Sequence, residues 1–496
     1  MKLTIIHTSD VHGSINGYQN IFNYVSKLEG NVMKIDSGDA IQGSPEMIFY
    51  KNNQKRFDNP IINTFNQIGY DYFVPGNHDF NYGLKYLRNF TNNIHAKTIC
   101  LNVIQGKSLY FDLSHDLKNI EGRQILTIGF TNHYVPYWEK KETIQNLSFI
   151  NPSQDYNLYI SNLKERYKPD LVIVAYHGGF NCDNDYQIIK NGSKENVGCE
   201  LLTPDVDILL TSHEHRLFVK KYNNQWISQP GYKGEHLIQF DVEFNDNYKQ
   251  IEAKIINLKD FNLSRDFLNL DEFKIAKEMF LNQVIAKNSG PTLEFKDPVT
   301  DRIVKPAIAQ LFNEIQMELT KADISICSFP NDILGLSDEI TIREVLETYV
   351  FSNTLFLCKI SGHILKEALI ENAQFFTFNG QDIVVNKQFE IPKKMYFQYD
   401  FYEGIEYKII VHSTQNNEVV DLTFKGKPID EDMTFLITMN SYRFMGGGYQ
   451  TWQKELEIVR EFPIDVSEMI TEYLVRKHTI NVNYKNNIKV VKGKNS

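Results

Sequence analysis

Five short apolar segments in the first half of this 496-residue chain are each followed by a loop that carries aspartate, asparagine or histidine. The segments are Lys2–Ile6, Val32–Ile35, Tyr72–Val74, Leu171–Ala175 and Ile208–Leu210. They alternate with helical stretches up to about residue 260, and this alternation predicts an α/β layered domain. Because loops at one set of strand ends converge on a common crevice, we expect the five loops to meet at one site.

The loops supply nitrogen and oxygen donors and no thiolate, a set that suits two divalent ions such as Mn, Fe, Co or Zn. Three donors are assigned to one ion: Asp10, His12 and His215. Three more are assigned to the other: Asn77, His177 and His213. Asp39, the donor of the second loop, is expected to bridge the ions at roughly 3.5–4 Å separation. A single histidine at a strand end is more often a hydrogen-bonded loop residue, but five such loops together favour a metal site.

His78 follows a predicted ligand but is not needed as one. We therefore expect it to face a substrate phosphate and to stabilise the leaving oxygen. The chain carries 52 Lys and Arg against 62 Asp and Glu, a formal net charge of −10. That balance argues against binding of long nucleic acids, which needs a basic stripe. It does not argue against small anionic substrates, because two divalent ions would add about +4 to the site.

The five cysteines include no CxxC pair, so a thiolate zinc site is not expected. Cys182 and Cys199 could meet across one loop, but we expect small, partly buried thiols instead. The first residues, MKLTIIHTSD, do not resemble a signal peptide, and no apolar run approaches the roughly 18–20 residues of a membrane span. We therefore predict a cytoplasmic protein without membrane contact.

The pattern changes after Asp260. The stretch LNLDEFKIAKEMFLNQVIA has apolar residues three and four positions apart and predicts an amphipathic helix that ends at Ser289–Pro291. A second helix-rich segment is predicted over Val299–Leu319. These features predict a metal domain over 1–262, a connecting helix over 263–292 and a C-terminal domain over 293–496.

Several longer strings resemble a known family. HTSDVHG, DSGDAIQGSP, PGNHDFNYG, YHGG and SHEH are similar to the calcineurin-like metallophosphoesterases. With TIREVLETYVFSNTLFLCKISGHILKEAL and NSYRFMGGGYQTW they resemble, more narrowly, the 5′-nucleotidase and 2′,3′-cyclic-nucleotide phosphodiesterase family over nearly the whole chain. The resemblance implies a four-layer α/β/β/α metal domain, a connecting helix and an α+β C-terminal domain with a nucleoside pocket. By local match, Phe375 and Tyr449 would sandwich the base, with core packing as the alternative for both.

Two departures from the family pattern bear on the substrate. Where 5′-nucleotidases usually pair the catalytic histidine with an aspartate three positions later, His78 is followed by Asn81. Asn81 can hold the ring but supplies no charge, so less stabilisation of an imidazolium is expected. The stretch ICSFPNDILGLSDEI lacks the arginine that grips the phosphate in 5′-nucleotidases. Both departures favour the 2′,3′-cyclic-nucleotide 2′-phosphodiesterase/3′-nucleotidase branch, whose members are usually exported.

The expected activity is hydrolysis of small nucleotides, with in-line attack on phosphorus by a metal-bound hydroxide and assistance from His78. The first alternative is a 5′-nucleotidase, with or without nucleotide-sugar hydrolase activity. A catalytically silent nucleotide-binding protein and a phosphoesterase for a non-nucleotide substrate also remain open. The oligomeric state is not predicted.

Overall fold

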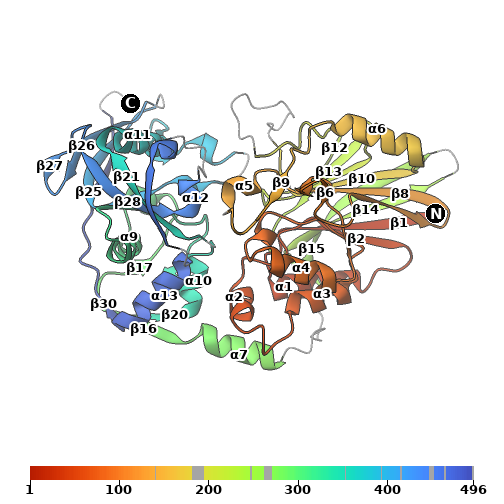
Figure 1. Ribbon diagram of the computed structural model, residues 1–496, viewed down its shortest axis with the longest axis horizontal. Helices are drawn as coiled ribbons and strands as arrows, with labels where there is room; N and C mark the ends of the chain where they lie inside the picture. The colour runs from red at the N-terminus through yellow and green to blue at the C-terminus, as the bar shows by residue number, and fades with distance from the viewer. Residues whose placement is uncertain are drawn as a thin grey trace. The chain divides into compact units, whose positions relative to one another are not determined.

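The computed structural model describes residues 1–139, 141–180, 195–245, 248–261, 271–351, 353–391, 394–413, 416–445, 452–462 and 465–493. The chain divides into two compact units, Met1–Ile275 and Ala276–Ser496 (Figure 1). The predicted base-stacking residue Tyr449 lies outside the described residues. Within the described residues, no helix is both long enough and apolar enough to cross a membrane.

The N-terminal unit contains two six-stranded sheets. The first has the order β15 (Lys249–Asn257), β14 (His236–Phe244), β1 (Lys2–Thr8), β2 (Val32–Asp36), β3 (Tyr72–Phe73), β4 (Lys97–Thr98). The second has the order β12 (Leu217–Tyr222), β13 (Gln225–Pro230), β11 (Ile208–Thr211), β10 (Leu171–Tyr176), β8 (Arg123–Phe130), β7 (His115–Ile120). All five predicted segments are strands, and β1, β2 and β3 are parallel neighbours, as are β8, β10 and β11. Their carboxyl ends therefore lie at matching edges of the two sheets.

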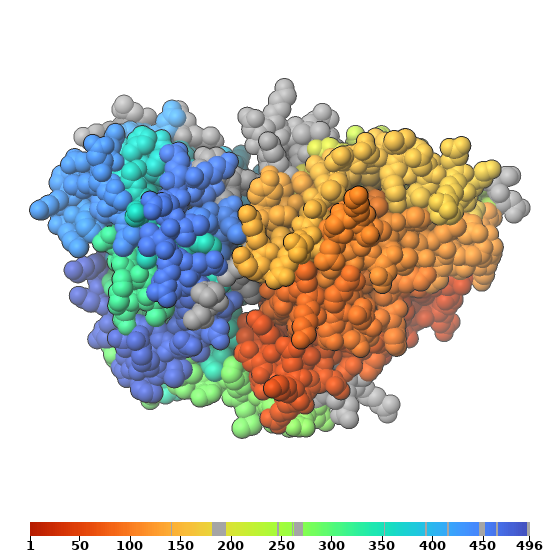
Figure 2. Space-filling view, in the orientation of Figure 1, coloured from red at the N-terminus to blue at the C-terminus, as the bar shows by residue number. Residues whose placement is uncertain are grey.

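Alternation along β10 shows how the layers pack. Ile173 and Ala175 belong to a core that also contains Leu3 and Ile5 of β1, so this core lies between the two sheets. Residues of the opposite face of β10 pack in a second core with α6 (Tyr156–Tyr167), which forms part of the outer surface of this unit (Figure 2). Because successive side chains of a strand point to opposite faces, one fully apolar strand serves both cores.

Helices also cover the outer face of the first sheet. These are α1 (Ile15–Val25), α3 (Pro60–Ile68) and α4 (Leu84–Asn93) (Figure 1). The ring of Phe65 in α3 contacts Phe73 of β3 and Phe90 of α4, with centroids 5.7 and 5.2 Å apart. The expected α/β/β/α layering is therefore confirmed. This unit also contains two short helices, α2 (Pro45–Asn52) and α5 (Val135–Trp138), and a small sheet of β6 (Ser108–Leu109), β5 (Val103–Gln105) and β9 (Leu147–Phe149).

The C-terminal unit is α+β, as expected. Its five-stranded sheet has the order β24 (Phe401–Glu403), β18 (Ile324–Cys327), β28 (Thr434–Asn440), β21 (Leu355–Ser361), β29 (Glu457–Phe462). A four-stranded sheet has the order β27 (Lys427–Pro428), β26 (Glu418–Phe424), β25 (Ile405–Val411), β31 (Ile488–Lys492). Two-stranded sheets pair β17 (Leu293–Glu294) with β19 (Gly335–Leu336) and β22 (Phe376–Phe378) with β23 (Ile383–Val385). The helices are α8 (Thr300–Ile303), α9 (Ala307–Thr320), α10 (Ile342–Thr348), α11 (Gly362–Ala373), α12 (Ser441–Phe444) and α13 (Val466–Lys477).

The predicted connecting helix is shorter than expected. Within the described residues it spans Asp271–Leu281 as α7, and residues 284–288 form strand β16 instead (Val284–Asn288). β16 pairs with β20 (Glu339–Thr341) and β30 (Thr479–Ile480). The helix prediction was wrong for these residues because a short apolar run fits a strand as well as a helix, and pairing decides between them.

The cysteines differ from the prediction at one position. Cys100, Cys327 and Cys358 are buried free thiols, as expected for isolated cysteines. Cys199, however, is disulfide-bonded, so the prediction of a thiol was wrong there. Cys182 lies outside the described residues.

Candidate dinuclear metal site

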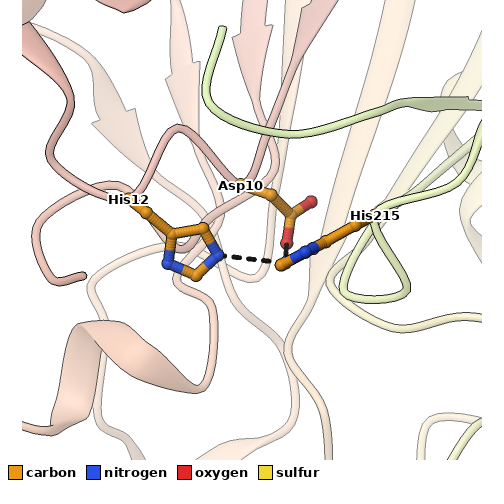
Figure 3. Close-up of side chains that lie close together, drawn as sticks. All are labelled: Asp10, His12 and His215. Carbon is orange, nitrogen blue, oxygen red and sulfur yellow. Dashed lines mark hydrogen bonds and ion pairs between the residues drawn. The ribbon is translucent and has the colours of Figure 1, made fainter. Parts of the chain in front are cut away.

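The first predicted ligand group is assembled from two loops. Asp10 and His12 follow β1, and His215 follows β11. One donor atom from each lies within 4.8 Å of the other two, and Figure 3 shows the three side chains directed toward one another. His215 Nε2 is 3.0 Å from His12 Nε2 and 3.6 Å from Asp10 Oδ1. Two imidazoles and a carboxylate at such distances form a donor set that suits a divalent transition metal.

The second group comes from four loops. Asp39, His177 and His213 also place one donor atom each within 4.8 Å of the others. Asn77 joins them, because its Oδ1 is 3.0 Å from His177 Nε2 and 2.9 Å from His213 Nδ1. The structure thus brings together the same residues that the sequence assigned to the second ion.

Asp39 lies between the two groups. Its Oδ1 accepts a hydrogen bond from the His78 backbone N–H at 2.7 Å. Its Oδ2 is 3.2 Å from His177 Nε2 in the second group and 4.0 Å from His12 Nε2 in the first. This oxygen is buried and accepts no hydrogen bond from any described residue. A buried carboxylate oxygen without a donor, placed between two nitrogen-rich groups, fits a ligand shared by two cations.

The backbone around the site is strained. Five of the seven predicted ligands have positive φ: Asp10 (53°), His12 (53°), Asp39 (54°), His213 (72°) and His215 (57°). Such residues cost of order 1–3 kcal/mol each and persist only where the surroundings hold them. Two backbone hydrogen bonds do so here, from Asp10 N to Gly38 O at 2.8 Å and from His12 N to Asp39 O at 2.9 Å. They tie the loop after β1 to the loop after β2.

A residue without an assigned role in the sequence, Asp79, holds two ligand loops in place. Its Oδ2 accepts hydrogen bonds from the backbone N–H groups of Asp39 and Gly76 at 2.9 and 2.7 Å. Its Oδ1 accepts from Ala40 and Ile41 at 2.8 and 3.0 Å. Burial raises the pKa of Asp79 to about 6, and the nearby carboxylate of Asp39 adds to this effect. In the sequence, only its position two residues after the predicted ligand Asn77 could have pointed to Asp79.

Carbonyl groups and aromatic rings orient the histidines. His177 Nδ1 is 2.6 Å from the carbonyl oxygen of Ser37, which can only accept, so Nδ1 carries the proton and Nε2 offers a lone pair to the site. Aromatic rings stack on two other histidines. Trp138 lies over His213 with centroids 5.2 Å apart, and Tyr232 lies over His215 at 5.0 Å. No motif in the sequence pointed to Trp138 or Tyr232.

His78 lies beside the first group, with its ring centroid 5.3 Å from that of His12. Its Nδ1 is 2.8 Å from Asn81 Oδ1, so the structure pairs the two residues that the sequence placed together. The catalytic role of this pair stays a prediction, as do the metal-binding roles of the seven ligands.

Comparison with known proteins identifies the family. Residues 3–217 match the calcineurin-like phosphoesterases, and residues 284–455 match the 5′-nucleotidase C-terminal domain. The chain is a metallophosphoesterase of the 5′-nucleotidase family. It is therefore a phosphoric-ester hydrolase, and the family resemblance seen in the sequence is confirmed.

Individual relatives of this metallophosphoesterase are distant in sequence. A 2′,3′-cyclic-nucleotide 2′-phosphodiesterase/3′-nucleotidase from Salmonella typhimurium is 24% identical, over 90% of this chain and 82% of the relative. A 5′-nucleotidase from Vibrio vulnificus is also 24% identical, over 97% of this chain and 92% of the relative. The structure of a Staphylococcus aureus protein described as a 5′-nucleotidase, in complex with alpha-ketoglutarate, has a TM-score of 0.91 at 24% identity and covers 99% of this chain and 100% of its own. This last likeness shows the shared fold.

The electrostatics of the predicted ligands favour bound cations. Burial raises the pKa of Asp10 to about 7. Burial would also raise the pKa of Asp39, but His177 and His78 lower it well below its usual range. In return, although burial alone would lower it, Asp39 raises the pKa of His177 to about 9. Asp39 and His177 thus balance each other electrostatically, and bound divalent ions would take over this task.

The structure does not place Phe375 where a base could stack on it. Phe375 is 1% exposed and is surrounded by the rings of Phe376, Phe389, Tyr396 and Tyr399. Its burial matches the core-packing alternative, because a ring enclosed by other rings has no open face. Phe397 and Tyr442, in contrast, are only half-buried, with centroids 6.3 Å apart.

Proposed function

We propose that this metallophosphoesterase hydrolyses small nucleotides at a pair of divalent ions, Mn, Zn, Co or Fe, with the specificity of a 2′,3′-cyclic-nucleotide 2′-phosphodiesterase/3′-nucleotidase. The observation that carries the proposal is the position of Asp39 Oδ2, which has no hydrogen-bond donor among the described residues and lies between two three-residue groups. One group is Asp10, His12 and His215; the other is Asn77, His177 and His213.

The chain's own residues prepare the site for this chemistry. Bound divalent ions supply Lewis acidity and activate water at neutral pH. His177 is held in the tautomer that a ligand needs, because Ser37 O fixes its other nitrogen. His78 is held through Nδ1 by Asn81, which leaves Nε2 to stabilise charge on the leaving oxygen.

Two features favour the cyclic-nucleotide branch over its alternative. The Salmonella typhimurium relative bears the name of that activity. In addition, this chain has Asn81 in place of the aspartate, and no arginine in residues 326–340, where the 5′-nucleotidase pattern has one. A 5′-nucleotidase is the second candidate, because the Vibrio vulnificus relative is so named at equal identity.

The test is a side-by-side assay of 2′,3′-cAMP, 3′-AMP, 5′-AMP and UDP-glucose with enzyme that has been stripped by chelator and then reloaded with Mn or Co. We expect activity to disappear on chelation, to return on reloading, and to be highest with 2′,3′-cAMP and 3′-AMP. Undiminished activity after complete chelation would overturn the two-metal proposal. A clear preference for 5′-AMP would establish the second candidate instead.

The C-terminal unit is proposed to hold the nucleoside. Replacing the half-buried Phe397 by Leu is expected to raise KM for nucleotides and to leave hydrolysis of p-nitrophenyl phosphate unchanged. If neither Phe397→Leu nor Tyr449→Ala changes the nucleotide KM, a non-nucleotide substrate becomes the better hypothesis.

The cytoplasmic location stays a prediction. A disulfide such as that of Cys199 is more usual in oxidising compartments.

A further inference from the structure

Three side chains form a hydrogen-bonded row that leads away from the metal site. His78 Nδ1 is 2.8 Å from Asn81 Oδ1, and Asn81 Nδ2 donates to Glu139 Oε1. His78 begins the short helix η1 (His78–Phe80), Asn81 follows it, and Glu139 follows α5. The row therefore joins two segments that are far apart in the sequence.

The chemistry of the three groups fixes the direction of both hydrogen bonds. An amide has an oxygen on one side and an NH₂ group on the other, so Asn81 alone could present either one to an imidazole. An ionised carboxylate only accepts, so Glu139 must receive the Asn81 NH₂ group. The amide oxygen of Asn81 then faces His78, and the proton on that side of the imidazole must be on Nδ1.

We propose that Glu139 is a positioning residue that acts through Asn81: it fixes His78 in the tautomer protonated at Nδ1 and places a negative charge behind the ring. This inference rests on the proposed function for the role of His78 in hydrolysis. It also changes the expectation drawn from the sequence. Asn81 carries no charge itself, but Glu139, the next residue along the row, supplies a negative charge.

The surroundings of Glu139 suit this role. Its backbone N–H donates to Val135 O at 2.9 Å, which closes the turn of α5. The preceding residue, Trp138, stacks on the predicted ligand His213 with an interplanar angle of 22°. The end of α5 is thus fixed to the site at two points. Asn81 and Glu139 are both half-buried, so water screens their interaction less than it would on an open surface.

An exchange of the two polar groups tests the row. In N81D the new carboxylate and Glu139 are in contact, and like charges at that distance repel. In E139Q the acceptor-only group is lost, so the amide of Asn81 can turn. In N81D/E139Q the carboxylate now at position 81 accepts directly from His78 Nδ1, and the amide now at position 139 donates to that carboxylate, which restores both features. The matched control is E142Q, which removes the charge of an exposed glutamate three positions after Glu139 in the sequence.

We expect each single variant to lose about tenfold in kcat, part of the 10²–10⁴-fold that a positioned acid or base contributes. KM should change less than twofold, and the double variant should return to within about threefold of wild type. The loss in E139Q should be larger for 3′-AMP than for p-nitrophenyl phosphate, because the p-nitrophenolate oxygen is weakly basic and needs little stabilisation as it leaves. E142Q should equal wild type. Metal content, measured by mass spectrometry, should remain the same in every variant.

Two results would overturn the proposal: E139Q indistinguishable from E142Q, or a double variant no more active than N81D. A separate readout covers the case in which the chain hydrolyses none of the assayed nucleotides and the proposed function fails. In the zinc-loaded protein, ¹⁵N NMR of His78 should show a protonated Nδ1 in wild type and in N81D/E139Q, with a mixture of tautomers in E139Q. A single unchanged tautomer in E139Q refutes the positioning role whatever the activity.

Discussion

Gly76 is the position where the smallest substitution should damage the metal site most. It lies directly before the predicted ligand Asn77. A Cβ added to Gly76 would lie 2.3 Å from both the backbone nitrogen and Oδ1 of Asp39, and 2.6 Å from His177 Cε1. The φ of Gly76 is not in the left-handed region, so alanine meets no backbone penalty there. The cost of Gly76→Ala is therefore steric.

The size of the effect follows from these distances. Moving from 2.3 Å to the 3.4 Å of ordinary contact requires a shift of about 1 Å in Asp39 or in the loop of Gly76. Overpacking of this kind costs about 1–3 kcal/mol of unfolding free energy. The effect on metal binding should be greater, because ligand distances tolerate only about 0.2 Å. A misplacement of 1 Å can also cost about 100-fold in rate. We expect loss of the ion bound by Asp39 and His177.

The assay measures metal content per chain, kcat/KM and the denaturation midpoint of purified Gly76→Ala. Gly106→Ala is the matched control, since it lies in the same unit at φ 64° with no described residue within 4 Å of an added Cβ. That control should lose only about 1–2 kcal/mol from backbone strain and keep both ions. If Gly76→Ala also keeps two ions and full activity, the close packing of Asp39 and His177 against Gly76 does not control metal binding or catalysis at this site.

Asp39→Asn should abolish turnover and reduce the bound metal from two ions toward one, measured by metal analysis; two retained ions would refute a bridging role. Asp79→Asn turns one carboxylate oxygen into an NH₂ group that faces two backbone N–H donors, and each hydrogen bond to a charged group that is lost costs about 1.5–3 kcal/mol. The denaturant midpoint should therefore fall, and a rise would contradict the reasoning. In the metal-free protein, burial raises the pKa of Asp36 to about 8, and Asp39 raises that of His177 to about 9 against the opposing effect of burial. The folded state then holds more protons than the unfolded chain between pH 6.5 and 9, so its stability should fall as pH rises through this range. Added Mn should reverse the fall, and a metal-free protein that gains stability over the range would contradict these shifts.

Local sequence patterns failed where long-range packing decides the outcome. Residues 284–288 were predicted as the end of an amphipathic helix but pair with strands near positions 340 and 480. Phe375 matched a substrate-binding string but lies among four aromatic rings from 376, 389, 396 and 399. Cys199 is disulfide-bonded although a thiol was expected there. For residues 284–288 and for Phe375, most of the deciding contacts come from residues outside the window from which the prediction was made.

The sequence by itself determined the α/β class, the five strands that precede the predicted ligand loops, and the seven predicted donors at the ends of those strands. It could do so because strand periodicity is local and ligand chemistry depends on residue type. Only the tertiary structure decided how those donors are arranged. It placed Asp39 Oδ2 between the two groups, held the ligand loops on Asp79 and connected Asn81 to Glu139. These features are distances between atoms on separate segments, and they depend on how two sheets and their loops pack.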